Sequence, residues 1–128
     1  MSKRIIESEL SYKIMSILFD VHTKLGNQYQ EKHYQRAIEM AFNKAKLQYK
    51  KQVCVDLLYD NHKIGKNFLD FIVENKIIVE LKTVSVFRYQ DVRQVLAYLK
   101  LAKLPLGILV NFRSQQLSYK RILNPEAI

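Results

Sequence analysis

The chain has 128 residues, and its 21 lysines and arginines outnumber its 12 aspartates and glutamates, which leaves a formal charge of +9 at pH 7. This length predicts one domain over residues 1–128, and the positive charge favours a nucleic acid over an acidic small molecule as the partner. A single cysteine excludes an internal disulfide, three scattered histidines exclude a zinc finger, and all apolar runs are shorter than the roughly 18 to 20 residues of a membrane span.

The amino-terminal residues do not resemble a signal peptide. Met-Ser-Lys-Arg-Ile-Ile-Glu-Ser lacks the long apolar segment that such a peptide needs. We therefore expect a soluble, cytoplasmic protein. The one cysteine, Cys54, stands in an alternating apolar run, and we expect it to be a small core residue.

Two helices are predicted in the first third of the chain. Apolar residues recur at helical spacing over residues 8–24, and Gly26 follows where a left-handed cap would end the helix. A second apolar stripe predicts a helix over about residues 30–46, with Glu31 in its first turn. For His22, near the end of the first helix, a capping or packing role is favoured, and a place at the rim of a cleft is the alternative.

Alternating apolar residues then predict a three-stranded antiparallel meander. The first strand covers residues 53–59, turns at residues 60–63, and leads into a second strand that begins at Ile64. A turn of residues 74–76 connects the second strand to the third, which ends at Lys82.

The rest of the chain predicts a helix and two short strands. Apolar residues recur at helical spacing from Val92 to Ala102, ahead of Pro105, and residues 106–112 and 117–123 have the composition of strands. A helix between two strands can connect parallel neighbours. We therefore predict an α/β fold, bordering on α+β, in which helices flank a mixed central sheet made of the antiparallel meander and strands beyond a crossover helix.

Three charged residues interrupt the apolar pattern of the second and third strands. With a three-residue turn, residue i pairs with residue 150 minus i, so Asp70 lies opposite Glu80 with Cβ atoms roughly 4.5 to 5.5 Å apart. Lys82 projects from the same face. The opposite face would then be wholly apolar, with Leu69, Phe71, Val73, Ile77, Val79 and Leu81. Two carboxylates so placed suit Mg²⁺ and a lysine suits a phosphate or its attacking water, although an ordinary solvated hairpin face is the alternative.

Together with later residues, this trio resembles the PD-(D/E)xK nuclease superfamily. Asp70 and Glu80-Leu81-Lys82 match its motif, and Gln94-Val95-Leu96-Ala97-Tyr98 resembles the Gln-x-x-x-Tyr element of its RecB-like branch. Nearly the whole chain is similar to the small GxxExxY proteins, through Glu9-Leu10-Ser11-Tyr12, Val21-His22-x-x-Leu25-Gly26, Glu31-x-x-Tyr34, Ile78-Val79-Glu80-Leu81-Lys82 and Leu109-Val110-Asn111-Phe112. The glycine expected three residues before the glutamate is Gln28 here, although Gly26 remains.

The resemblance implies a restriction-endonuclease-like core with a site for a divalent metal. Asp70, Glu80 and the main-chain carbonyl of Leu81 would hold Mg²⁺ or Mn²⁺. Glu31 would supply a further carboxylate, directly or through a water, and Lys82 would assist the attacking water.

The resemblance also implies that Gln94 and Tyr98 complete the catalytic set from the third helix. Their i, i+4 spacing puts both side chains on one helix face. Tyr98 and Tyr34 have an alternative as half-buried core aromatics, and Gln94 as a surface glutamine. His33 should point away from Glu31 on its helix, so we do not expect it to be a metal ligand.

We therefore predict a metal-dependent nuclease that hydrolyses phosphodiester bonds, with DNA favoured over RNA. A catalytically inactive nucleic-acid-binding or regulatory module on the same fold is the alternative, and a second copy or a protein partner is left open. Basic residues around the third helix could bind phosphates, or could simply form a solvated face: Arg88, Arg93, Lys100 and Lys103.

Overall fold

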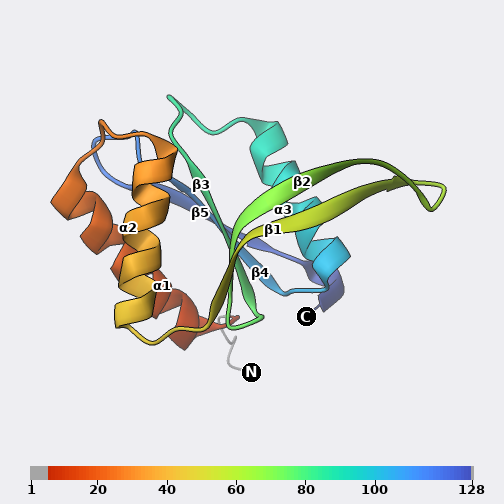
Figure 1. Ribbon diagram of the computed structural model, residues 1–128, viewed down its shortest axis with the longest axis horizontal. Helices are drawn as coiled ribbons and strands as arrows, with labels where there is room; N and C mark the ends of the chain where they lie inside the picture. Colours follow the sequence, from red (N-terminus) through yellow and green to blue (C-terminus); the bar gives the residue numbers. More distant parts are fainter. Residues whose placement is uncertain (1–5, 128) are drawn as a thin grey trace, which may run out of the picture.

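A central sheet separates two helical layers in the computed structural model, which describes residues 6–127 (Figure 1). The helices are α1 (Ser8–Leu25), α2 (Glu31–Lys44) and α3 (Tyr89–Ala102), and the strands are β1 (Tyr49–Tyr59), β2 (His62–Val73), β3 (Ile77–Lys82), β4 (Leu106–Asn111) and β5 (Ser118–Leu123), followed by a 3₁₀ turn, Pro125–Ala127. Helices α1 and α2 cover one face of the sheet, and α3 covers the other.

The sheet is mixed, as the sequence predicts. Its strand order is β1-β2-β3-β4-β5. The neighbours are antiparallel except for β3 and β4, which run parallel because α3 carries the chain from one to the other. Strands β3 and β4 therefore end at the same edge of the sheet, at Lys82 and Asn111.

The helix boundaries differ from the predicted ones for local reasons. Helix α2 ends at Lys44, before the predicted limit, because Lys46 has a positive φ of 59° and turns the chain toward β1. Helix α3 begins at Tyr89, three residues before the apolar stripe, because the Asp91 carboxylate accepts a hydrogen bond from the Arg88 N–H at 2.9 Å and so caps the first turn.

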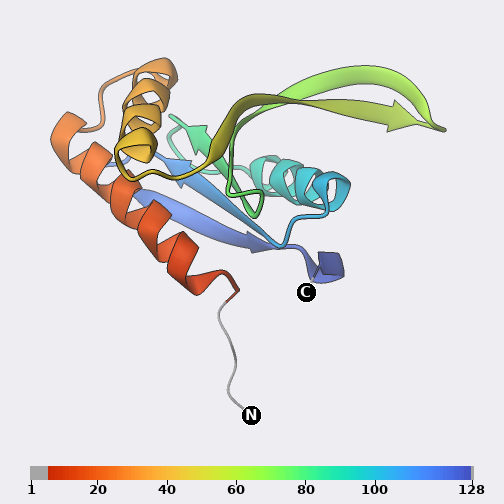
Figure 2. The same cartoon turned by 60° about the horizontal axis from the view of Figure 1, so that its bottom comes forward.

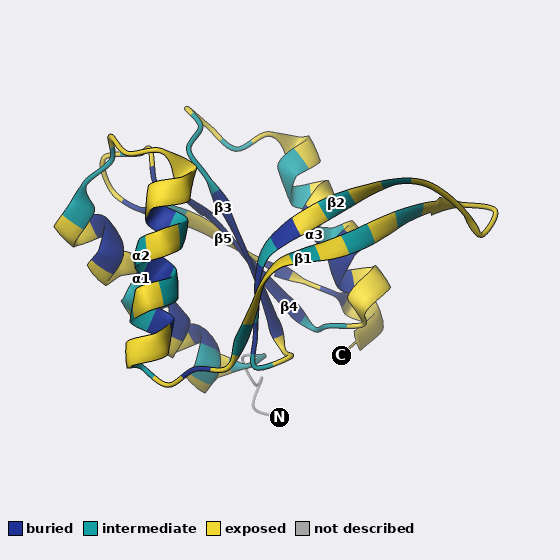
Figure 3. Ribbon diagram, in the orientation of Figure 1, coloured by how far each residue is buried: buried dark blue, intermediate teal, exposed yellow. Residues whose placement is uncertain are grey.

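Two apolar clusters hold the layers together, and Figure 3 shows their residues on the central strands and the inner helix faces. The residues Ile77 and Val79 face α1 and α2, whereas Ile78 faces α3. This alternation is that of a strand buried on both sides. The predicted register is confirmed, because Phe71 pairs with Val79.

Strands β1 and β2 continue together as an arm beyond the rest of the molecule (Figure 2). The arm bends at Gln52, which has a positive φ of 49° and stands opposite Asp70 in the register. Beyond the bend, Leu69 packs in the α3 cluster while Phe71 packs in the other, so the predicted common face of these two residues is wrong. Cys54 is exposed on the arm, so its predicted core position is also wrong.

None of the helices within residues 6–127 has the length and apolarity that a membrane crossing requires. Residues 1–5, which carry most of the segment compared with a signal peptide, lie outside the described part of the chain.

Gly107 on β4 allows α3 to approach the sheet closely. A Cβ at this position would stand 2.6 Å from Val95 Cγ1 and 3.4 Å from Leu99 Cδ1. We expect Gly107→Ala to lower the free energy of unfolding by about 1–3 kcal/mol through overpacking, measured by urea denaturation. Gly65→Ala is the control, since its Cβ would meet only Leu57 Cδ1 at 3.6 Å; equal stability of the two variants would contradict the prediction.

Candidate functional site

The two predicted carboxylates lie where β2 separates from β3. The main-chain pairing of β2 with β3 ends at Phe71 and Val79. Beyond this pair, carboxylate side chains in place of main-chain carbonyls accept the hydrogen bonds of main-chain N–H groups. The Asp70 N–H donates to Glu80 Oε1 at 2.7 Å, and the Leu81 N–H donates to Asp70 Oδ2 at 2.8 Å. The strands therefore part around two carboxylates that each cap the opposite strand.

The main-chain carbonyl of Leu81 faces the same gap. In an extended strand the N–H and C=O of one residue point to the same side, and the Leu81 N–H points to Asp70. The next carbonyl, that of Lys82, points the other way and accepts from the Phe112 N–H at 2.9 Å. Two carboxylates and one carbonyl thus converge between β2 and β3.

Burial raises the pKa values of both carboxylic acids of this pair, and for Glu80 the charge of Asp70 adds to the effect. Burial, followed by the charge of Asp70, raises the pKa of Glu80 to about 8. Burial also raises the pKa of Asp70, although hydrogen bonds from Leu81 and Gln35 and the charge of Lys82 oppose this effect. Glu80 is only 8% exposed, so little water is available to stabilise two negative charges.

Lys82 lies beside this pair and also contacts an acidic residue of α3. Its Nζ is 3.9 Å from Asp91 Oδ1, and its positive charge lowers the pKa values of Glu31, Asp70 and Glu80. The ammonium therefore lies in the field of every acidic residue predicted for the site. Asp91 is a neighbour that the sequence analysis did not predict.

Helix α2 brings two residues to the same place. Partial burial and the charge of Asp70 raise the pKa of Glu31, which shows that this otherwise exposed carboxylate shares the field of the strand pair. Gln35 donates from Nε2 to Asp70 Oδ1 at 2.7 Å and was missed by the sequence analysis. Its i+4 spacing from Glu31, on the same helix face, is the signal that could have found it.

The third helix contributes a tyrosine from the other side of the sheet. Tyr98 is almost fully buried, at 2% exposure, and burial together with the charge of Glu80 raises the pKa of its hydroxyl. Contacts with the side chains of Gln94 and Asn67 lower it. Tyr98 therefore lies in the field of Glu80, and Gln94 and Asn67 contact its hydroxyl. Gln94 is exposed, and Asn67 of β2 has no sequence signal.

The segment between α1 and α2 is held by Tyr34. Its hydroxyl donates to the Gly26 carbonyl at 2.6 Å and accepts from the Tyr29 N–H at 3.2 Å, and its ring stacks on Phe112 at 4.5 Å. Gly26 has φ 81° and ψ −161°, a region that essentially only glycine adopts. Tyr34 is thus a buried residue that shapes the loop leading to Glu31, and Gln28 occupies a position that needs no glycine.

Two histidines have structural roles. His22 is buried, and its Nε2 lies 3.0 Å from the Ser114 carbonyl oxygen, which confirms a packing role. His33 accepts a hydrogen bond from the Gln30 N–H through Nδ1 at 3.2 Å.

The predicted basic track lies along α3 and is exposed throughout: Arg88, Arg93, Lys100 and Lys103. The Arg93 guanidinium stands over the Tyr89 ring at 5.7 Å, and Lys100 lies 4.0 Å from Glu126. Contact with nucleic acid remains a prediction for this track.

The groups that converge between β2 and β3, the carboxylates of Asp70 and Glu80 and the carbonyl of Leu81, fit a hard divalent cation. Carboxylate and carbonyl oxygens are the donors that Mg²⁺ prefers, with waters completing its shell, and a cation would relieve the repulsion that raises the pKa of Glu80. Within residues 6–127, no three His, Cys, Asp or Glu side chains are grouped closely enough to form a metal cluster by themselves. A metal here would therefore need main-chain and water oxygens besides Asp70 and Glu80.

A mixed sheet flanked by helices, with an acidic pair and a lysine on adjacent strands, defines a restriction-endonuclease-like fold. The profile of the PD-(D/E)XK nuclease superfamily matches residues 8–122. The chain belongs to this superfamily, as the sequence predicts. Membership of the GxxExxY group within it stays a prediction.

A solved structure titled "Crystal structure of SSO0001" shares this fold. It is 16% identical to the present chain, with a TM-score of 0.55, and the superposition covers 96% of this chain and 79% of the other. A search of curated proteins finds no match.

Proposed function

We propose that the protein is a metal-dependent nuclease that hydrolyses phosphodiester bonds, in DNA rather than RNA. The observation that supports this most directly is the pair of carboxylates, the partly buried Asp70 and the buried Glu80, which face each other where their strands part. Such a pair is costly to maintain without a cation. Membership of a nuclease superfamily points to the same chemistry.

Asp70, Glu80 and the Leu81 carbonyl would hold Mg²⁺ or Mn²⁺, and Glu31 would reach it through a water. When bound, the cation would polarise the phosphate and lower the pKa of water for attack. Gln35, by donating to Asp70, keeps one carboxylate oriented toward the gap.

Lys82 would act on the phosphate directly. An ammonium beside the carboxylates can orient the attacking water and stabilise the charge that develops in the transition state. Asp91, 3.9 Å away, limits where the ammonium can lie. Gln94 and Tyr98 would bound the cleft from α3 and position the substrate.

The test is a cleavage assay over a panel of single- and double-stranded DNA and RNA, with Mg²⁺, Mn²⁺ or EDTA. We expect hydrolysis with either metal and none with EDTA. Glu80→Ala should show no hydrolysis, whereas the control Glu126→Ala, which removes an exposed carboxylate near the carboxyl end of the chain, should match the wild type. Metal-independent binding with no cleavage of any member would favour the inactive module instead.

Binding itself should depend steeply on salt. The net charge of +9 implies that bound strands release condensed counterions, so the logarithm of affinity should fall linearly with that of salt, by roughly 0.7 to 0.9 per phosphate contacted. Fluorescence anisotropy of a labelled oligonucleotide measures this slope. Binding that is undetectable even near about 50 mM salt would point to a protein-interaction role.

A further inference from the structure

A polar pocket of about 490 Å³ adjoins the carboxylates at the edge where β3 and β4 end. Its walls are residues 27–31, Thr83 and Arg113. Glu31 lines this pocket and lies in the field of Asp70, and Thr83 directly follows Lys82 in the chain, so the pocket lies next to the candidate metal site. The space beyond the carboxyl ends of parallel strands is where α/β folds commonly bind ligands.

The main chain that carries Arg113 is held firmly. Its N–H donates to Asn111 Oδ1 at 3.1 Å, and its carbonyl accepts from Asn27 Nδ2 at 3.0 Å. The same Asn111 side chain, 2% exposed, accepts from the Val84 N–H and donates to the Val84 carbonyl. The loops that present Thr83 and Arg113 are therefore locked to each other.

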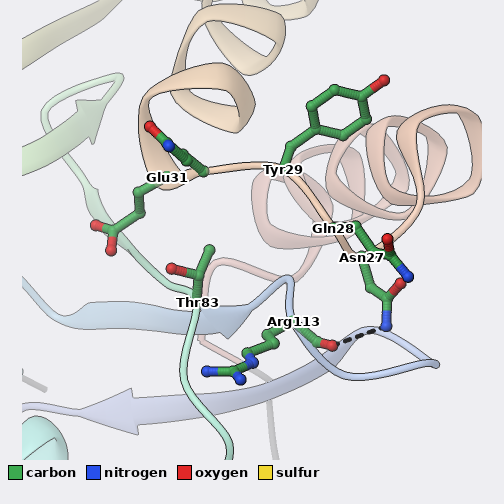
Figure 4. A pocket seen from close by; sticks show the side chains of 7 residues that line it. Asn27, Gln28, Tyr29, Glu31, Thr83 and Arg113 are labelled. Carbon is green, nitrogen blue, oxygen red and sulfur yellow. Dashed lines mark hydrogen bonds between the residues drawn. The ribbon is translucent and has the colours of Figure 1, made fainter.

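The Arg113 guanidinium, by contrast, has no side-chain or main-chain partner among the described residues. Within residues 6–127 it makes no ion pair, whereas the guanidinium of Arg121 donates to Ser11 Oγ and to the Ile6 carbonyl, both at 2.8 Å. Figure 4 shows Thr83 between Glu31 and Arg113, with the three side chains extended toward the same side. An arginine so presented offers a fork of donors to an anion from outside the chain.

The charges around the pocket favour a phosphate as that anion. Four carboxylates, those of Glu31, Asp70, Glu80 and Asp91, would be balanced by Lys82, one divalent cation and Arg113, since Asp91 lies 3.9 Å from Lys82. The site as a whole would then not repel a phosphodiester, and the Arg113 guanidinium is the positive group at the pocket that can bind it. No aromatic ring of the pocket faces this group in Figure 4, because the Tyr29 ring points away from it, so the pocket has no platform for a base.

We propose that this pocket is a phosphate subsite in which Arg113 and Thr83 bind the backbone phosphate next to the one that is cleaved. The proposal rests on the nuclease function proposed above. It implies that a bound strand runs from the carboxylates across the ends of β3 and β4, and that this contact is independent of base sequence.

The experiment compares three variants of the full chain for binding of a labelled oligonucleotide across a range of salt. Ca²⁺ replaces Mg²⁺ because its longer bonds and looser geometry should leave the strand intact. Arg113→Gln should weaken binding about tenfold and reduce the magnitude of the salt slope by about 0.7 to 0.9. Thr83→Val should weaken it about two- to fivefold with the slope unchanged, because it removes a hydroxyl and no charge.

Arg36→Gln is the matched control, because it removes the same charge from an exposed position of α2 outside the pocket; it should weaken binding less than about twofold. Equal losses in Arg113→Gln and Arg36→Gln, or a loss in Arg113→Gln with an unchanged slope, would overturn the subsite while leaving the nuclease function standing. Absence of wild-type binding and cleavage would overturn both. Thermal melting of each variant verifies that it is folded.

Discussion

Replacing Glu80 should abolish hydrolysis by weakening metal binding, and replacing Lys82 should abolish it while metal binding persists. The two residues lie on one strand, but in the proposed mechanism the buried carboxylate of Glu80 binds the metal, whereas the ammonium of Lys82 acts on the phosphate. Removal of a single group that stabilises transition-state charge typically costs about 10²–10³ in rate. We expect a loss of at least this size in Lys82→Ala.

Calorimetric titration with Mn²⁺ separates the two effects. Glu80→Gln is the sharper variant, since the amide oxygen can still accept the hydrogen bond that Asp70 N–H donates at 2.7 Å, so the strand gap keeps its shape. We expect its Mn²⁺ affinity to fall and that of Lys82→Ala to stay near the wild-type value. Equal affinity in the wild type and in an Asp70→Ala, Glu80→Ala double variant would refute the metal site.

The metal-free protein should lose stability as the pH rises from about 4.5 to about 8. Burial and the charge of Asp70 raise the pKa of Glu80 from 4.5 to about 8, so over this interval the folded state retains a proton that the unfolded chain has released. Stability falls with pH wherever the folded state binds more protons. The stabilising contribution is complete below the unfolded pKa and is lost as the pH passes through the folded one.

Urea denaturation in EDTA between pH 4.5 and 9 measures this dependence. At the alkaline end, Glu80→Gln should be more stable than the wild type by up to about 5 kcal/mol, and the difference should vanish near pH 4.5. Adding Mg²⁺ at pH 8 should restore the stability that the wild type has lost, because a ligand that binds the folded state stabilises that state by mass action.

Glu39→Gln is an informative control, because the carboxylate of Glu39 should change stability with pH in the opposite direction to that of Glu80. A hydrogen bond from Lys51 lowers the pKa of Glu39, so its small contribution is present at neutral pH and is lost as the pH falls. A Glu80→Gln curve parallel to that of the wild type across the whole range would show that Glu80 is not a repelled, buried carboxylate.

The hairpin at the centre of the site could be predicted because its determinants are local. Side chains alternate with a period of two, and a turn of known length sets the register; the structure has this turn, with Glu74 and Asn75 at positive φ values of 54° and 55°. The pairing of Phe71 with Val79 follows. The mixed sheet was predictable for a similar reason, since a helix between two strands permits their parallel alignment.

The arm shows where local pattern was insufficient. The expected faces of Leu69 and Cys54 assumed a regular strand, and the positive φ of Gln52 bends β1 opposite Asp70. The spacing of apolar residues in a sequence does not reveal which residue of a strand departs from the extended backbone conformation. Such irregularities concentrate beside functional sites because they redirect side chains, and here the bend falls at the first carboxylate.

The sequence by itself therefore determined the acidic hairpin, the order of the elements and the superfamily, because each depends on short-range spacing or on motif residues that can be read directly. Only the tertiary structure decided which distant residues surround the hairpin. Gln35 reaches Asp70, and Lys82 approaches Asp91, through the docking of α2 and α3 on opposite faces of the sheet. The pocket of Arg113 exists because β3 and β4, far apart in the chain, end side by side. Long-range packing depends on the complementary shapes of whole faces, which no local spacing encodes.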